Sequence, residues 1–138
     1  MKANRVVLGG ALLLGLAAPV GALGSGPALM HAKLKPIAPV RTGSGNFAAS
    51  AVETKGTVKM KWQLSLSHLS GSATKATLRL TGLRGVTFVV CKPCSASGHG
   101  QVGLVSSVWD NMLAHGAQLV VATRAHPQGE LRGTVSRR

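Results

Sequence analysis

Apolar and polar residues alternate without a break from Thr57 to Leu66. The apolar positions include Trp62, and the polar positions include Lys59 and Lys61. Successive side chains of a β-strand point to opposite faces of a sheet, so the segment predicts a strand with one buried face and one wet, cationic face. The buried face needs a second apolar surface to cover it, which favours two packed antiparallel sheets.

Short runs with β-forming patterns occur on both sides of this segment and predict further strands. They lie at 47–52, 73–81, 86–90, 101–105, 119–122 and 130–135. One short helix is predicted over 108–114, because Ser106 and Ser107 are suited to cap its beginning and Gly116 is suited to end it. The pattern therefore predicts an all-β domain with one short helix.

Residues 1–22 have the three-part pattern of a secretory signal peptide. Lys2 and Arg5 precede an apolar run at 6–16, and small residues around Ala22 form a suitable cleavage site. The apolar run is too short to span a bilayer. We expect cleavage near Ala22 and a mature chain without a transmembrane segment, secreted or held in the periplasm or cell wall.

Residues 23–45 are rich in proline, glycine and basic residues, and we predict a flexible basic tether there. The residues that suggest this include Pro27, Pro36, Pro39, Lys33, Lys35 and Arg41. The β-domain is accordingly predicted to span residues 46–138.

The charge of the chain is strongly unbalanced, with 16 Lys and Arg residues against three Asp and Glu residues. Loss of Lys2 and Arg5 with the signal peptide lowers the formal charge from +13 to +11. Such a charge favours association with polyanions, so an anionic envelope polymer or another exported protein is the expected partner. Basic residues are scattered and Tyr is absent, which argues against a specific nucleic-acid site. The possible polyanion contacts are Lys59, Lys61, Arg79 and Arg124.

The two cysteines form the motif Cys91-Lys-Pro-Cys94. In an exported protein with no other cysteine, a structural disulfide is the expected state. The alternative is a thiol-disulfide or metal-binding protein centred on this motif, because His99 would supply a third ligand for zinc. A structural zinc site needs four ligands, however, and redox motifs of this spacing open a helix, whereas the flanking residues here predict strands.

Acid–base catalysis lacks suitable residues in this sequence. Glu53, Asp110 and Glu130 are the only acids and are widely separated, whereas paired carboxylates must lie close together. Glu130 and Arg132 would share one face of a strand, which predicts an ion pair between them. We therefore expect a protein that is not an enzyme, with no catalytic residues, no metal site and no cofactor.

Three segments resemble the CHRD domain, a module named from chordin that also occurs in exported bacterial proteins. They are 62–74, which includes Trp62 and Gly71; Cys91–Cys94 with Gly98 and Gly100; and Pro127-Gln-Gly129-Glu130-Leu-Arg132-Gly133. The resemblance covers about Asn46 to Val135. It implies an immunoglobulin-like antiparallel β-sandwich or barrel, similar in outline to copper/zinc superoxide dismutase, and no established biochemical activity.

The sequence departs from the CHRD pattern where the family has three histidines. Thr77-Leu78-Arg79 and Gln118–Thr123 stand at these positions, so no metal or ligand role of those histidines carries over. The sequence thus predicts an exported, non-enzymatic CHRD-like domain that binds or decorates the cell envelope through a cationic surface. Ligand recognition by loops at one end of the sandwich is a further possibility that the sequence leaves open.

Overall fold

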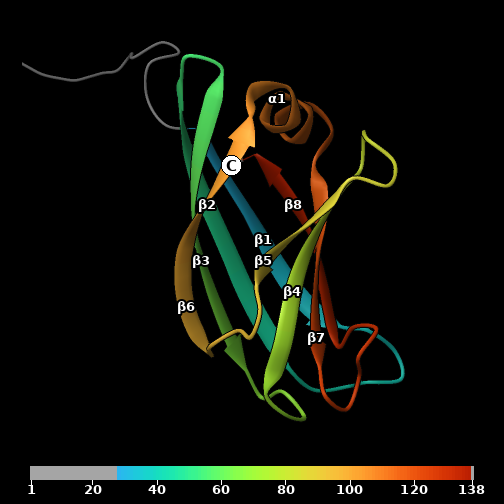
Figure 1. Cartoon of the computed structure of the whole chain (residues 1–138). Coiled ribbons are helices and arrows are strands. Elements are labelled where there is room, and N and C mark those ends of the chain that lie inside the picture. Colours follow the sequence, from blue (N-terminus) through green and yellow to red (C-terminus); the bar gives the residue numbers. More distant parts are fainter. Residues whose placement is uncertain (1–27, 138) are drawn as a thin grey trace, which may run out of the picture.

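The structure, a computed structural model, describes residues 28–137, and the predicted signal peptide at 1–22 lies outside them. Eight strands and one helix follow each other as β1 (Ala28–Pro36), β2 (Ser44–Thr54), β3 (Thr57–Ser67), β4 (Ala73–Leu80), β5 (Thr87–Cys91), β6 (Ser97–Val105), α1 (Ser106–His115), β7 (Ala117–Thr123) and β8 (Leu131–Arg137). The strands form a single sheet in the order β5-β4-β7-β8-β1-β2-β3-β6, and neighbouring strands are antiparallel. Figure 1 shows that this sheet curls into a nearly closed barrel. The predicted all-β antiparallel class with one short helix is confirmed.

The faces of β3 and its register with β2 follow from the local sequence. The side chains of β3 alternate strictly between exposed and buried along its whole length, as the polar–apolar pattern predicts. A two-residue turn at Lys55-Gly56 joins it to β2, and both residues have positive φ, at 52° and 81°. Turns with two positive φ values match the twist of the strands that they connect, which fixes the register of the pair.

The predicted tether at 23–45 is wrong from residue 28 onward, because residues 28–36 form β1 in the middle of the sheet. This strand pairs with β2 on one side and with β8 on the other. Met30, Ala32 and Leu34 point into the barrel and are buried. Burial of these side chains stabilises an extended segment whose one proline, Pro36, is its last residue, where it does not interrupt the pairing. The described domain therefore begins at Ala28 and not at Asn46, and the part of the tether at 23–27 lies outside the described residues.

Strand β6 begins four residues earlier than predicted. Ser97, Gly98, His99 and Gly100 pair with β3, so only residues 92–96 lie between β5 and β6. A Cβ atom built on Gly100 would lie only 2.7 Å from the Trp62 ring. Glycine lets this strand lie flat against the indole, a contact that strand propensity alone does not predict.

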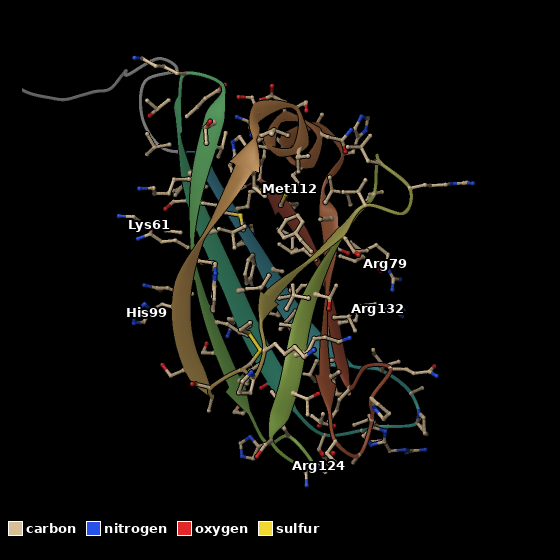
Figure 2. The ribbon with its side chains drawn as sticks, viewed as in Figure 1. Lys61, Arg79, His99, Met112, Arg124 and Arg132 are labelled. Atoms are coloured by element: carbon tan, nitrogen blue, oxygen red, sulfur yellow. A yellow bond between two sulfur atoms is a disulfide. The ribbon has the colours of Figure 1, made fainter. Side chains whose placement is uncertain are left out.

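Helix α1 closes one end of the barrel (Figure 1). Trp109 and Met112 are buried, and Figure 2 shows Met112 pointing from the helix into the barrel. Gly116 ends the helix with a φ of 79°, as predicted. The predicted serine cap is wrong, because the N-cap is Val105 without a side-chain hydrogen bond, and the Ser106 hydroxyl donates instead to Glu53.

Strands β5 and β6 are the two edges of the sheet, and residues 92–96 connect them across the opening of the barrel. The connection is held by backbone hydrogen bonds to the neighbouring strands. Cys94 N donates to Ala73 O at 3.2 Å, and Leu66 N donates to Ala96 O at 2.7 Å. Paired backbone groups at this end leave less of the two edges free.

Candidate functional site

The side chains of β1, β2, β3 and β6 that point away from the barrel interior form a mainly polar surface, here called the outer face, on which Leu29 and Val52 are also exposed. Strand register places these side chains in rows that cross the four strands. The central row is His31–Ala48–Gln63–His99. The rows on either side of it are Lys33–Asn46–Ser65–Ser97 and Leu29–Ser50–Lys61–Gln101.

Two adjoining hollows lie along the outer face, with volumes of about 620 Å³ and about 1020 Å³. Both are wide open to solvent and share Ala48, Gln63 and His99. Ala48 and Ser50 are short, while the surrounding lysine, glutamine and histidine side chains are long. The result is a shallow trough with a flat floor and hydrogen-bonding walls, which fits an extended ligand better than a compact one.

The outer face carries positive charge and no carboxylate. Lys33, Lys35, Lys59 and Lys61 are exposed there. The three acids of the chain lie elsewhere: Glu53 is opposite the inward-pointing Val58, Asp110 is in α1, and Glu130 precedes β8. No anionic side chain competes for these lysines, so the face attracts polyanions.

The four predicted polyanion contacts do not form one surface. Lys59 and Lys61 lie on β3 at the outer face, whereas Arg79 lies on β4 and Arg124 follows β7. Figure 2 shows Lys61 and His99 on one side of the molecule, Arg79 and Arg132 on the other, and Arg124 at one end. Sequence reasoning missed Lys33, Lys35 and His31 because it placed them in a tether. The alternation of Met30, Ala32 and Leu34 with polar residues was the signal that could have found them.

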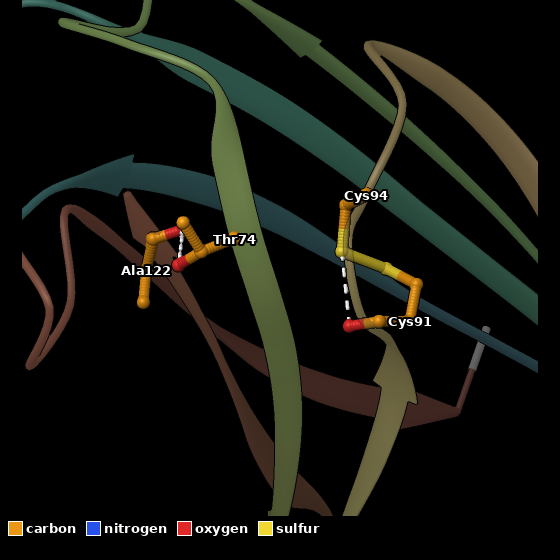
Figure 3. The surroundings of a disulfide bond; sticks show 4 residues. All are labelled: Thr74, Cys91, Cys94 and Ala122. Atoms are coloured by element: carbon orange, nitrogen blue, oxygen red, sulfur yellow. Dashed lines mark hydrogen bonds between the residues drawn. A yellow bond between two sulfur atoms is a disulfide. The ribbon is translucent and has the colours of Figure 1, made fainter. Parts of the chain in front are cut away.

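The cysteine motif lies where β5 leaves the sheet. Cys91 ends β5, and its Sγ lies 2.04 Å from that of Cys94, the distance of a disulfide bond (Figure 3). Cys94 Sγ also lies 3.2 Å from the Cys91 carbonyl oxygen. A disulfide sulfur has no proton to donate, so in the oxidised protein this is a contact and not a hydrogen bond. Thr74 Oγ1 donates to Ala122 O nearby, at 3.2 Å, and ties β4 to β7.

The motif and His99 do not form a common metal site. Cys94 is buried, whereas His99 is exposed on the outer face in register with Gln63. Within residues 28–137, no three His, Cys, Asp or Glu side chains are close enough together to hold a metal ion. No helix begins at Cys91, so the motif lacks the helix N-terminus that lowers the pKa of an attacking thiol in redox proteins.

We expect that replacing both Cys91 and Cys94 by alanine lowers the free energy of unfolding by about 2 kcal/mol, because the disulfide closes a very short loop. Urea unfolding of the variant and of the reduced wild-type protein, followed by circular dichroism, measures the loss. Both should remain folded, since backbone hydrogen bonds also hold residues 92–96. A variant without β structure would show that the disulfide holds the whole barrel together.

Glu130 is a buried structural carboxylate at the end of the barrel away from α1. It is 0% exposed and accepts hydrogen bonds from Ser70 N at 2.8 Å, from the Ser70 hydroxyl, and from Thr123 Oγ1 at 2.7 Å. Burial raises the pKa of this carboxyl, but the hydrogen bonds from Ser70 and Thr123 and the charge of His126 lower it, and the net pKa lies below its ordinary value. A carboxylate that accepts three hydrogen bonds and stays ionised is poorly suited to act as a general base.

The predicted ion pair between Glu130 and Arg132 is wrong. Glu130 precedes β8, and its buried carboxylate faces Ser70 and Thr123, whereas Arg132 is exposed on β8. The backbone of Glu130 also joins two other segments, since Ile37 N donates to Glu130 O at 2.9 Å and Glu130 N donates to Val121 O at 2.7 Å. Glu130 thus connects the loops that follow β1 and β3 to strand β7.

The remaining residues of the segments that resemble the CHRD domain also pack in the barrel or lie in its loops. A Cβ atom on Gly133 would lie 2.5 Å from the Lys33 carbonyl oxygen, and Gly129 has a φ of 135°. Trp62 is buried beneath β6, while Gly71 and Pro127 are exposed in the loops after β3 and β7. These residues shape the barrel and its loops and do not gather into a reactive centre.

Comparisons with protein-family models, with curated proteins and with solved structures found no match. In the part of the chain that the structure describes, no helix has the length and apolar character needed to cross a bilayer. A function for this protein is therefore inferred from the surface of the chain itself.

Proposed function

We propose that the protein is an exported, non-enzymatic CHRD-like module that attaches to an anionic polymer of the cell envelope. The signal-peptide pattern at 1–22 supports export, and the segments at 62–74 and 127–133 support the CHRD assignment. The single observation that carries the binding function is the outer face, where four exposed lysines occur without a carboxylate.

Binding by such a face is mainly electrostatic. The lysines form one pair on β1 and one pair on β3, separated by β2, and a linear polyanion can contact several of them at once. Each contact releases a counterion from the polymer, so the affinity falls steeply as salt is added. A single exposed ion pair contributes little, and strength comes from the number of simultaneous contacts.

We expect the double variant Lys59→Gln/Lys61→Gln to bind an immobilised anionic polymer roughly tenfold more weakly than the wild-type protein at low salt. The matched control is Arg79→Gln/Arg124→Gln, which removes the same charge from positions away from the outer face. Affinity is measured with the mature chain, residues 23–138, over a series of salt concentrations.

The control pair should weaken binding much less than the lysine pair. Equal losses in the two variants would mean that net charge acts alone and that the outer face is not the binding surface. Flow-through of the wild-type protein at low salt would overturn the proposed function itself.

A further inference from the structure

We infer that the ligand of the outer face is a linear acidic polysaccharide that lies along the strands and crosses the row His31–Ala48–Gln63–His99. This inference rests on the proposed function and specifies its ligand. Adjoining rows are two residues apart along a strand, so the three rows extend over roughly 14 Å in the strand direction. That length accommodates several units of an extended chain, which fits the two adjoining open hollows better than a single small molecule does.

The side chains that line the hollows are suited to a ligand that carries hydroxyl groups as well as negative charge. Asn46, Gln63 and Gln101 carry side-chain amides, which donate and accept hydrogen bonds. A sugar hydroxyl does the same, so each amide can pair with it in either direction. A polyphosphate chain offers only acceptors, so it can pair with the amide N–H groups but leaves the amide oxygens to water.

The charge and shape of the outer face restrict the class of ligand further. Lys33 and Lys61 flank the central row on opposite sides, one at each hollow, and can reach acidic groups toward the two ends of the bound segment. Ala48 and Ser50 keep the floor low, so a flat sugar ring can approach the sheet backbone. Trp62 and Trp109 are buried, so these rings do not supply an exposed platform for stacking the bases of a single-stranded nucleic acid.

The experiment measures the affinity of the mature chain, by titration calorimetry, for three polymers of similar length: a polyuronate, a polyphosphate and a neutral polysaccharide. We expect the polyuronate to bind several-fold more tightly than the polyphosphate, and the neutral polymer to bind weakest. Gln63→Ala should weaken polyuronate binding about fivefold and polyphosphate binding clearly less, because a sugar hydroxyl can use both the donor and the acceptor of the amide and a phosphate uses only the donor.

The matched control is Gln128→Ala, which removes an exposed glutamine from the loop before β8 and should leave both affinities unchanged. Equal binding of polyuronate and polyphosphate, with no effect of Gln63→Ala, would overturn the polysaccharide inference while the polyanion function stands. Tight binding of the neutral polymer would overturn the role of the lysines. Failure of all three polymers to bind would remove the proposed function together with this inference.

Discussion

Replacement of Glu130 by alanine is expected to lower the free energy of unfolding by roughly 3 kcal/mol, because it leaves the Ser70 and Thr123 donors unpaired and opens a cavity. Small domains have a stability of about 5–15 kcal/mol, so this loss is a large fraction of the total. Urea unfolding at neutral pH measures it. The control is Asp110→Ala, an exposed acid in α1, whose loss should stay within about 0.5 kcal/mol.

The same carboxylate predicts how stability depends on pH. The folded pKa of Glu130 is lowered from its ordinary value of 4.5, so its ionised form stabilises the native state. This contribution is fully present above the unfolded pKa and is lost as the pH falls through the lower folded pKa. Glu130→Gln should remove this part of the acid dependence, since a glutamine does not titrate. Parallel stability–pH curves for the wild-type protein and the Glu130→Gln variant below pH 4.5 would show that Glu130 is not the titrating group.

The second large effect is expected for Leu34→Ala in β1, which should lower the free energy of unfolding by about 3 kcal/mol. Leu34 is 0% exposed, and its side-chain carbons lie against the backbone of Gly45 and Gly133 on the two neighbouring strands. The control is Lys35→Ala, the exposed next residue, which should change stability by less than about 0.5 kcal/mol. Urea unfolding with circular dichroism compares the two.

Equal and small effects of the two substitutions would mean that residues 28–36 behave as a tether, as their proline and glycine content alone suggests. A large effect confined to Leu34→Ala would instead establish β1 as a central strand. The result matters for function, because His31, Lys33 and Lys35 belong to the outer face only if β1 is held in the sheet.

Residues 57–66 predicted β3 with its correct faces because alternation is a local property with a period of two. The same reasoning found the helix and the all-β class, since each depends on short-range patterns. The segments that resemble the CHRD domain include Glu130 and Gly133. The sequence does not show that Glu130 accepts buried hydrogen bonds or that Gly133 allows the close approach of β1. Glu130 was assigned to an ion pair because strand spacing placed Arg132 beside it, whereas its actual partners are Ser70 in the loop after β3 and Thr123 at the end of β7.

Strand β1 and the early start of β6 follow from contacts between residues far apart in the chain. Proline- and glycine-rich segments have weak local preference for a strand, so burial of Leu34 between β2 and β8, and contact of Gly100 with Trp62, decide their conformation. Local sequence therefore determined the class of the fold, the faces of its strongest strand and the excess of positive charge. Tertiary pairing alone decided which lysines, amides and histidines share the outer face, because strand order and register bring together side chains that the sequence keeps apart.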